Sequence, residues 1–157
     1  MNKKIAILGI LILGTAVLSG CTTSTEGKTY YFDEGGNMST TKQKPKAAEK
    51  LEVYYFHGTA RCYSCQTMGQ LVSDLISQRY SRQVKDGKID FKQINVDLPE
   101  NKEIARKYQA SGSSLFINRI IESQNKIEQD GNVWRYLSNE ANFNKYLGDK
   151  IDSYLGL

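Results

Sequence analysis

The pattern of apolar and polar residues changes character twice along the chain, near residues 20 and 50. Ile5 to Leu18 is almost wholly apolar, whereas residues 22–50 are rich in Ser, Thr, Lys, Gly and Glu. From residue 51 onward, short apolar runs alternate with segments in which apolar residues recur every three or four positions, as in strands and amphipathic helices. The pattern therefore predicts a leader, a polar connection and one folded domain over residues 51–157.

Four segments of the domain are rich in β-branched and aromatic residues and end in turn-forming residues. They predict strands over residues 51–56, 89–96, 115–121 and 127–137. The polar segment 122–125 predicts a turn between the last two strands, which must then be antiparallel. Asp130-Gly131 predicts a bend or bulge within the last strand.

Apolar residues at helical spacing predict three helices in the same domain. The first carries Cys65, Met68, Leu71, Val72, Leu75, Ile76 and Tyr80. In the second, Pro99 suits the first turn and Gly112 is expected to end the helix. The third begins after Ser138 or Asn139, either of which suits an N-cap. The order β-α-β-α-β-β-α predicts an α/β fold with a mixed four-stranded sheet and helices on both faces, because strand–helix–strand crossovers make parallel neighbours.

The leader has the features of a secretory signal in their usual order. Lys3 and Lys4 precede the apolar run, which is shorter than the roughly 20 residues that a membrane span needs. The run ends in Leu18-Ser19-Gly20-Cys21, which resembles the lipobox of bacterial lipoproteins. That resemblance implies cleavage before Cys21 and a lipid on its sulfur, which would hold the protein on the bacterial cell membrane, facing outside the cytoplasm.

On this interpretation residues 1–20 form a signal peptide and residues 21–50 a lipid-anchored, flexible tether. The alternative is an ordinary secretory signal that happens to be followed by a cysteine. Within the tether, Tyr30-Tyr31-Phe32 is an aromatic cluster that suits either packing on the domain or an added edge strand.

The charge balance argues against nucleic acid as a partner. The formal net charge is +4, and residues 1–20 hold two lysines and no acid, so 19 basic residues face 17 acidic ones without them. No cluster of Lys and Arg accompanies this small excess.

Cys62 and Cys65 remain once Cys21 is assigned to the lipid, and they form a CxxC motif between a predicted strand and a predicted helix. Outside the cytoplasm such a pair tends to form a disulfide unless something reduces it. A helix N-terminus stabilises a thiolate and would lower a thiol pKa from about 8.5 to about 7. Cys62, at the exposed start of the helix, is the expected attacking thiol, and Cys65, one turn further, the expected buried and resolving thiol.

These elements together resemble the thioredoxin-like superfamily. Cys62-Tyr63-Ser64-Cys65 follows a buried strand, a second strand closes with Ile94-Asn95-Val96-Asp97, and Gly112 turns into the third strand. Within the superfamily, the run Tyr55–Cys62 is similar to a bacterial group known as ArsF-like. The resemblance covers roughly residues 51–157 and implies a thiol–disulfide oxidoreductase without a bound cofactor. Its partners would be extracytoplasmic protein thiols and disulfides, or a membrane redox partner.

Three neighbours of the pair are candidates to modulate it. His57 could accept a proton from Cys65, or it could be an inert turn residue at the strand end. Arg61 stands where thioredoxins often carry Trp, and it could tune Cys62, bind an acidic partner or simply be solvated. Ser114 holds the position of the cis-proline that thioredoxin-like enzymes usually carry, and its own peptide bond is expected to be trans. Residues 54–56 replace a buried carboxylate of thioredoxins, so that proton relay is expected to be absent.

Two other classes of function fit the same cysteines. A metal-binding or delivery module would hold Cu(I) with Cys62 and Cys65, and His57 could add a third ligand. Ser114 bears on this alternative, because without a proline ring the thiols are more open to ligands. A noncatalytic surface lipoprotein would keep the pair as a static disulfide, although a loop of four residues gains little from closure. Redox chemistry is favoured because a CxxC between strand and helix is arranged for exchange.

Overall fold

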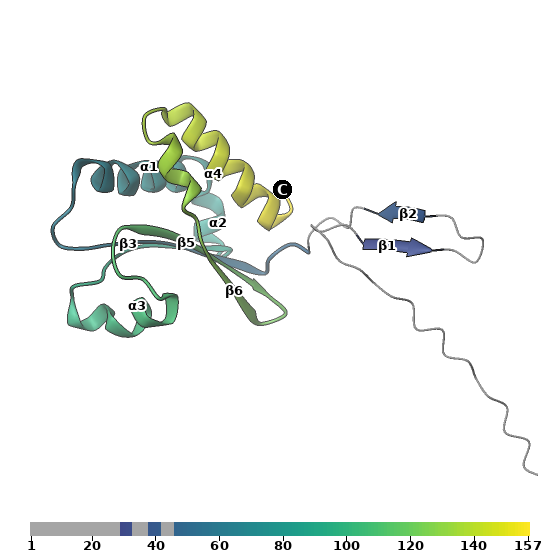
Figure 1. Cartoon of the computed structure of the whole chain (residues 1–157), viewed down its shortest axis with the longest axis horizontal. Helices are drawn as coiled ribbons and strands as arrows, with labels where there is room; N and C mark the ends of the chain where they lie inside the picture. Colours follow the sequence, from purple (N-terminus) through teal and green to yellow (C-terminus); the bar gives the residue numbers. More distant parts are fainter. Residues whose placement is uncertain (1–28, 33–37, 42–45) are drawn as a thin grey trace, which may run out of the picture. The chain divides into compact units, whose positions relative to one another are not determined.

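The computed structural model of the protein describes residues 29–32, 38–41 and 46–157 (Figure 1). The predicted signal peptide and Cys21 lie outside the described residues. The chain divides after Lys44 into two units, and each is described by itself. In the part of the chain that the structure describes, no helix has both the length and the apolar character needed to span a membrane.

The first unit contains an antiparallel hairpin. Its strands are β1 (Thr29–Phe32) and β2 (Met38–Thr41), with Tyr30 opposite Thr40. The aromatic cluster of the predicted tether is therefore a strand of a separate two-stranded sheet and not an added edge of the domain's sheet.

The second unit is built on a four-stranded sheet with the order β4-β3-β5-β6. The strands are β3 (Lys50–His57), β4 (Ile89–Asn95), β5 (Ser114–Ile121) and β6 (Gln124–Gln129). β3 pairs in parallel with β4 and antiparallel with β5, and β5 pairs antiparallel with β6. This arrangement confirms the predicted mixed sheet.

The helices lie on both faces of this sheet, as predicted. They are α1 (Tyr63–Arg79), α2 (Ser81–Lys85), α3 (Lys102–Tyr108), α4 (Glu140–Leu155) and the 3₁₀ turns η1 (Pro99–Asn101) and η2 (Asn132–Tyr136). Figure 1 shows α1 and α4 on one face and α3 on the other. The element order and the sheet order together confirm the predicted α/β fold, with a mixed four-stranded sheet and helices on both faces.

The side chains of β3 alternate between two apolar clusters. Val53 and Tyr55 belong to the cluster that α1 and α4 cover, whereas Tyr54 and Phe56 pack with α3. Successive side chains of a strand point to opposite faces. A strand that is covered on both faces therefore needs a nearly continuous apolar run, which is the pattern of residues 51–56.

The last strand begins and ends earlier than predicted. The hairpin turn consists of Glu122 and Ser123 alone, with φ angles of 52° and 61°, and such a two-residue turn matches the twist of the flanking strands. β6 then stops at Gln129, and the next residue, Asp130, turns its buried side chain inward, where it accepts a hydrogen bond from the backbone N–H of Asn132 at 3.0 Å. The predictions of a turn over 122–125 and of a strand continuing to residue 137 are therefore wrong.

Two helix boundaries also refine the prediction. α3 ends at Tyr108 and not at Gly112, because Gln109 adopts a left-handed conformation with φ of 54°. Of the two candidate caps for α4, Asn139 is the one that accepts the backbone N–H of Asn142, at 2.9 Å. Pro99 lies in the first turn of η1, which leads directly into α3.

Candidate functional site

The loop that joins β3 to α1 is fixed to the end of β4. The backbone N–H of Thr59 donates to Oδ2 of Asp97 at 2.7 Å, and Nδ2 of Asn95 donates to Oγ1 of Thr59 at 3.0 Å. A Cβ atom at Gly58 would stand 3.3 Å from the same Asp97 oxygen, so the contact leaves little room for a larger residue. The sequence indicated that the second strand closes near Asp97 but did not indicate this contact, which ties the loop before α1 to the residues after β4.

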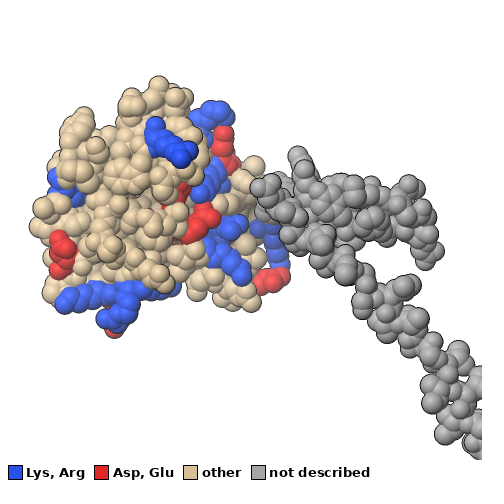
Figure 2. Space-filling model, viewed as in Figure 1, with Lys and Arg blue, Asp and Glu red and all other residues tan. Residues whose placement is uncertain are grey.

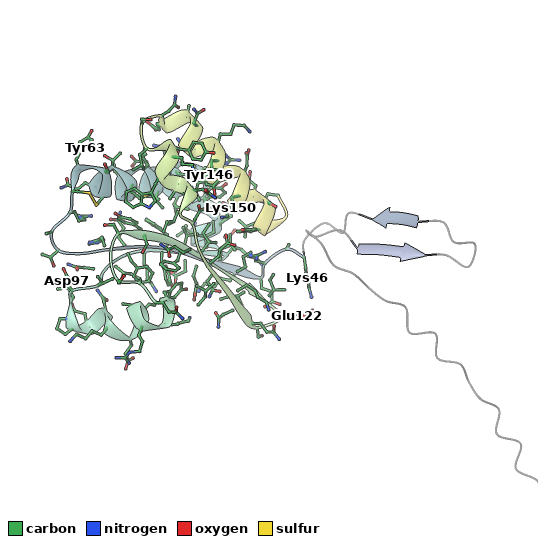
Figure 3. All side chains as sticks on the ribbon, viewed as in Figure 1. Lys46, Tyr63, Asp97, Glu122, Tyr146 and Lys150 are labelled. Atoms are coloured by element: carbon green, nitrogen blue, oxygen red, sulfur yellow. A yellow bond between two sulfur atoms is a disulfide. The ribbon has the colours of Figure 1, made fainter. Side chains whose placement is uncertain are left out.

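Cys62 and Cys65 form a disulfide at the start of α1, with their Cα atoms 5.1 Å apart (Figure 3). Cys62 is the N-cap residue, and its sulfur accepts a hydrogen bond from the backbone N–H of Cys65 at 3.3 Å. Cys62 is exposed and Cys65 is half-buried. The more accessible residue of the pair is thus the one at the very end of the helix, while Cys65, expected to be buried, is only half-buried.

The electrostatic surroundings of the pair favour a negative charge on sulfur. The first turn of α1 contains no acidic residue, so the partial positive charge of the helix N-terminus acts on Cys62 without opposition. Arg61 precedes Cys62 with an exposed side chain, and its carbonyl accepts a hydrogen bond from Nε2 of Gln66 at 3.1 Å. A thiolate at Cys62 would therefore meet an N–H group, a helix dipole and a neighbouring guanidinium group.

Tyr55 lies beneath the motif and is fully buried. Its hydroxyl donates to the carbonyl oxygen of Cys65 at 2.6 Å. Burial raises the pKa of Tyr55, while a hydrogen bond from the Ser113 side chain and the charge of Arg61 partly oppose that rise. In the sequence, Tyr55 stands out only as one of the residues that replace a carboxylate. The available signal was the alternation along β3, which turns Tyr55 toward the helix that carries the cysteines.

The side chain of His57 forms a hydrogen bond next to the end of β3. Its Nδ1 lies 2.9 Å from the carbonyl oxygen of Gly58, which makes Nδ1 the donor, and its ring centroid lies 5.8 Å from that of Tyr55. Among the residues that the structure describes, no three side chains of the types His, Cys, Asp or Glu are grouped to hold a metal ion.

Ser114 begins β5 opposite Phe56 and is 6% exposed. Its hydroxyl donates to the carbonyl oxygen of Gly112 at 3.0 Å, so it is engaged within its own loop. No peptide bond is cis in the described residues, which agrees with the trans bond expected before Ser114. The neighbouring Ser113 acts on Tyr55, whose pKa it lowers.

Comparison with protein-family models and with curated proteins finds no match to this chain. Among solved structures it is similar to the Trx4 domain of ERdj5, with 14% identity, coverage of 69% of this chain and 87% of that one, and a TM-score of 0.43. It is also similar to a thioredoxin from Fasciola hepatica, with 18% identity, coverage of 68% and 83%, and a TM-score of 0.43. At these values the function has to be argued from the site itself.

Proposed function

We propose that the protein is a thiol–disulfide oxidoreductase that acts on protein partners outside the cytoplasm through Cys62 and Cys65. The observation that carries this proposal is a disulfide between an exposed N-cap sulfur and a half-buried sulfur one turn later. A purely structural disulfide that closes a loop of four residues gains little stability from loop closure. Exchange chemistry, by contrast, needs what this position offers, namely an accessible sulfur whose thiolate is stabilised.

When the protein is reduced and its partner is oxidised, the exposed Sγ of Cys62 is the point of attack. A partner thiolate attacks it, the Cys62–Cys65 bond breaks, and Cys65 leaves as a thiolate that takes up a proton. A second thiolate of the partner then attacks the partner's sulfur in the mixed disulfide, which releases Cys62 as a thiolate and forms a disulfide in the partner. Two electrons have moved to the protein and no cofactor is required.

When the protein is oxidised and its partner is reduced, the same steps run backward. The Cys62 thiolate attacks a partner disulfide and forms a mixed disulfide, and the partner's second sulfur leaves. Cys65 loses its proton and attacks Sγ of Cys62, which expels the partner's first sulfur and closes the internal disulfide. The half-buried position of Cys65 keeps external thiols away from the resolving sulfur.

The surface beside the disulfide suits contact with a protein. Tyr63, between the two cysteines, is 85% exposed and projects away from the body of the domain (Figure 3). On the face seen in Figure 2, basic and acidic groups are scattered among larger uncharged areas. An exposed aromatic ring offers contact area that does not depend on strong opposite charge on the partner.

The extracytoplasmic location rests on the lipid proposed for Cys21. In cells that express the full-length chain, Cys21→Ser should abolish incorporation of a labelled fatty acid, whereas Cys62→Ser should retain it. A wild-type protein that never incorporates the label would show that the lipoprotein assignment is wrong.

The proposed chemistry is tested by equilibrating the full-length protein with glutathione redox buffers and counting free thiols by alkylation. Reversible interconversion of a Cys62–Cys65 disulfide and dithiol is expected, and Cys65→Ser should trap partners as mixed disulfides that Cys62→Ser does not form. Absence of exchange with every buffer, together with tight Cu(I) binding by the reduced protein, would replace the redox proposal with the metal-binding alternative.

A further inference from the structure

The hydroxyl of Tyr55 interacts with three segments around the disulfide. Its hydroxyl donates to the carbonyl of Cys65 in α1 at 2.6 Å. The side chain of Ser113, in the loop before β5, and the positive charge of Arg61, in the loop before α1, both lower the pKa of this hydroxyl. One buried polar atom is therefore bonded to the helix that holds the second cysteine and is influenced by the two neighbouring loops.

The ring of Tyr55 reaches this position because α1 leaves room for it. A Cβ atom at Gly69 would stand 2.9 Å from Cε1 of Tyr55 and 3.2 Å from Oε1 of Gln93. Nε2 of Gln93 in turn donates to the carbonyl of Gly69 at 3.2 Å. The bare backbone of Gly69 thus lets an aromatic ring cross beneath the helix and place its hydroxyl at the first turn.

The disulfide spans the first turn of α1. In the oxidised protein it holds Cys62 and Cys65 together. When the disulfide opens, that covalent link is lost, and the hydrogen bond from Tyr55 to the Cys65 carbonyl remains as a link between this turn and the sheet below.

We propose that Tyr55 is a positioning residue of the redox pair, holding Cys65 against Cys62 whenever their disulfide is open. This inference rests on the proposed function. Resolution of a mixed disulfide requires the sulfur of Cys65 to return to Sγ of Cys62, and its effective concentration there depends on how well the backbone is oriented. The same effective concentration determines the equilibrium between the internal disulfide and glutathione.

Tyr55→Phe removes the hydroxyl and keeps the ring against Gly69. Since one hydrogen bond is involved, the variant should shift the glutathione equilibrium toward the dithiol by about two- to tenfold. Release of glutathione from a preformed mixed disulfide at Cys62 should slow by a similar factor. Ser113→Ala, which removes the partner of Tyr55 in the facing loop, should shift both quantities in the same direction by a smaller factor.

Tyr80→Phe is the matched control at the far end of α1. Tyr80 is also fully buried, and its hydroxyl also donates to a helix carbonyl, that of Gly148 at 2.9 Å. A hydroxyl that serves stability alone would alter unfolding in both variants and leave the glutathione equilibrium unchanged in both. Only a positioning role separates Tyr55→Phe from Tyr80→Phe in that equilibrium and in the release rate.

Equal equilibria and equal release rates in the two phenylalanine variants would overturn the inference and leave the proposed function standing. A wild-type protein that shows no reversible exchange with glutathione would overturn both. If Tyr55→Phe does not fold, Ser113→Ala decides the matter, and an unchanged equilibrium in that variant would count against the proposal.

Discussion

The two ends of α1 have similar tyrosine contacts but serve different functions. At each end a buried tyrosine donates its hydroxyl to a helix carbonyl, Tyr55 to Cys65 at the N-terminal end and Tyr80 to Gly148 at the C-terminal end. The C-terminal end is closed by further contacts, since Tyr80 also donates to Asp152 at 2.7 Å and Arg79 forms an ion pair with the same carboxylate. The N-terminal end instead presents an exposed sulfur.

The difference shows how one helix can be both anchored and reactive. Arg79 in the last turn complements the negative end of the helix dipole and links α1 to α4. The positive end has no acidic residue in its first turn, so its N–H groups remain available to a charge that develops on sulfur. Because the anchoring contacts gather at one end, the other end needs only the contacts that keep Cys65 in place.

The largest expected effect comes from closing the space beneath the N-terminal half of α1. Gly69→Ala places a Cβ atom 2.9 Å from the ring of Tyr55, which is buried and held by its hydroxyl. We expect the free energy of unfolding to fall by about 2 kcal/mol, because overpacking costs up to about 3 kcal/mol and the helix propensity of Ala offsets about 1 kcal/mol. Urea unfolding of the oxidised protein measures this change.

Gly148→Ala, a substitution in α4 where it faces the C-terminal end of α1, is the control. The added Cβ would meet Nη1 of Arg79, which is the tip of a flexible side chain that can move aside. Its loss of stability should therefore stay below about 0.5 kcal/mol, since an exposed ion pair and the gain in helix propensity nearly cancel. Equal losses in both variants would contradict the tight fit of Tyr55 against Gly69.

A smaller effect is expected from Tyr80→Phe, which removes a hydroxyl bound to Gly148 and Asp152. The free energy of unfolding should fall by about 1 kcal/mol, and the glutathione equilibrium should stay as in the wild type. Urea unfolding and thiol counting on the same samples separate the two quantities. A changed equilibrium would mean that the two ends of α1 are coupled and that the division of tasks is wrong.

The strand-to-helix placement of the CxxC motif could be predicted from sequence because it depends on local patterns. An unbroken apolar run is what a strand covered on both faces requires, and apolar residues at helical spacing follow it directly. The position of the Tyr55 hydroxyl could not be predicted in this way. It depends on Gly69 lying opposite Tyr55 across the packed layers, and neither residue shows that relation in its own segment.

The end of β6 was mispredicted for a similar reason. Val133, Trp134 and Tyr136 continue an apolar pattern that looks like a strand, but they lie in η2. The strand stops because Asp130 turns inward, and a buried carboxylate needs a partner. That partner is Lys150 of α4, whose Nζ lies 2.8 Å from Oδ2 of Asp130. Twenty residues of sequence separate the two, so no local window contains the reason.

The next largest effect, after those of Gly69→Ala and Tyr80→Phe on the free energy of unfolding, appears at alkaline pH. Burial and the hydrogen bond to Asp152 raise the pKa of Tyr80, whereas an unfolded tyrosine ionises near pH 10. A raised pKa means that this contribution to stability is complete below pH 10 and is lost as the pH rises through the folded value. At pH 10.5 the wild type should have lost about 0.8 kcal/mol more than Tyr80→Phe, relative to pH 8.

Other tyrosines with raised pKa values remain in both proteins and cancel in this comparison. They are Tyr54, Tyr55, Tyr108, Tyr146 and Tyr154. Urea midpoints at the two pH values measure the difference. Parallel losses in wild type and variant would show that Tyr80 ionises equally well folded and unfolded.

The smallest effect concerns the two arginines that flank α1. Arg61 precedes Cys62 and is exposed, so its charge should stabilise a Cys62 thiolate by a few tenths of a kcal/mol, as exposed ion pairs do. Arg61→Gln should therefore slow alkylation of Cys62 in the reduced protein by about twofold at pH 6.5 and low salt.

Arg79→Gln removes the same charge about 25 Å away along the helix, far beyond the screening length of about 8 Å at physiological salt. It should weaken the contact with Asp152 and leave alkylation unchanged. Raising the salt to 1 M should erase the effect of Arg61→Gln, because screening then acts within about 3 Å. If Arg79→Gln slowed alkylation as much as Arg61→Gln, the reactivity of Cys62 would depend on the protein's overall charge and not on the local charges at the N-terminal end of α1.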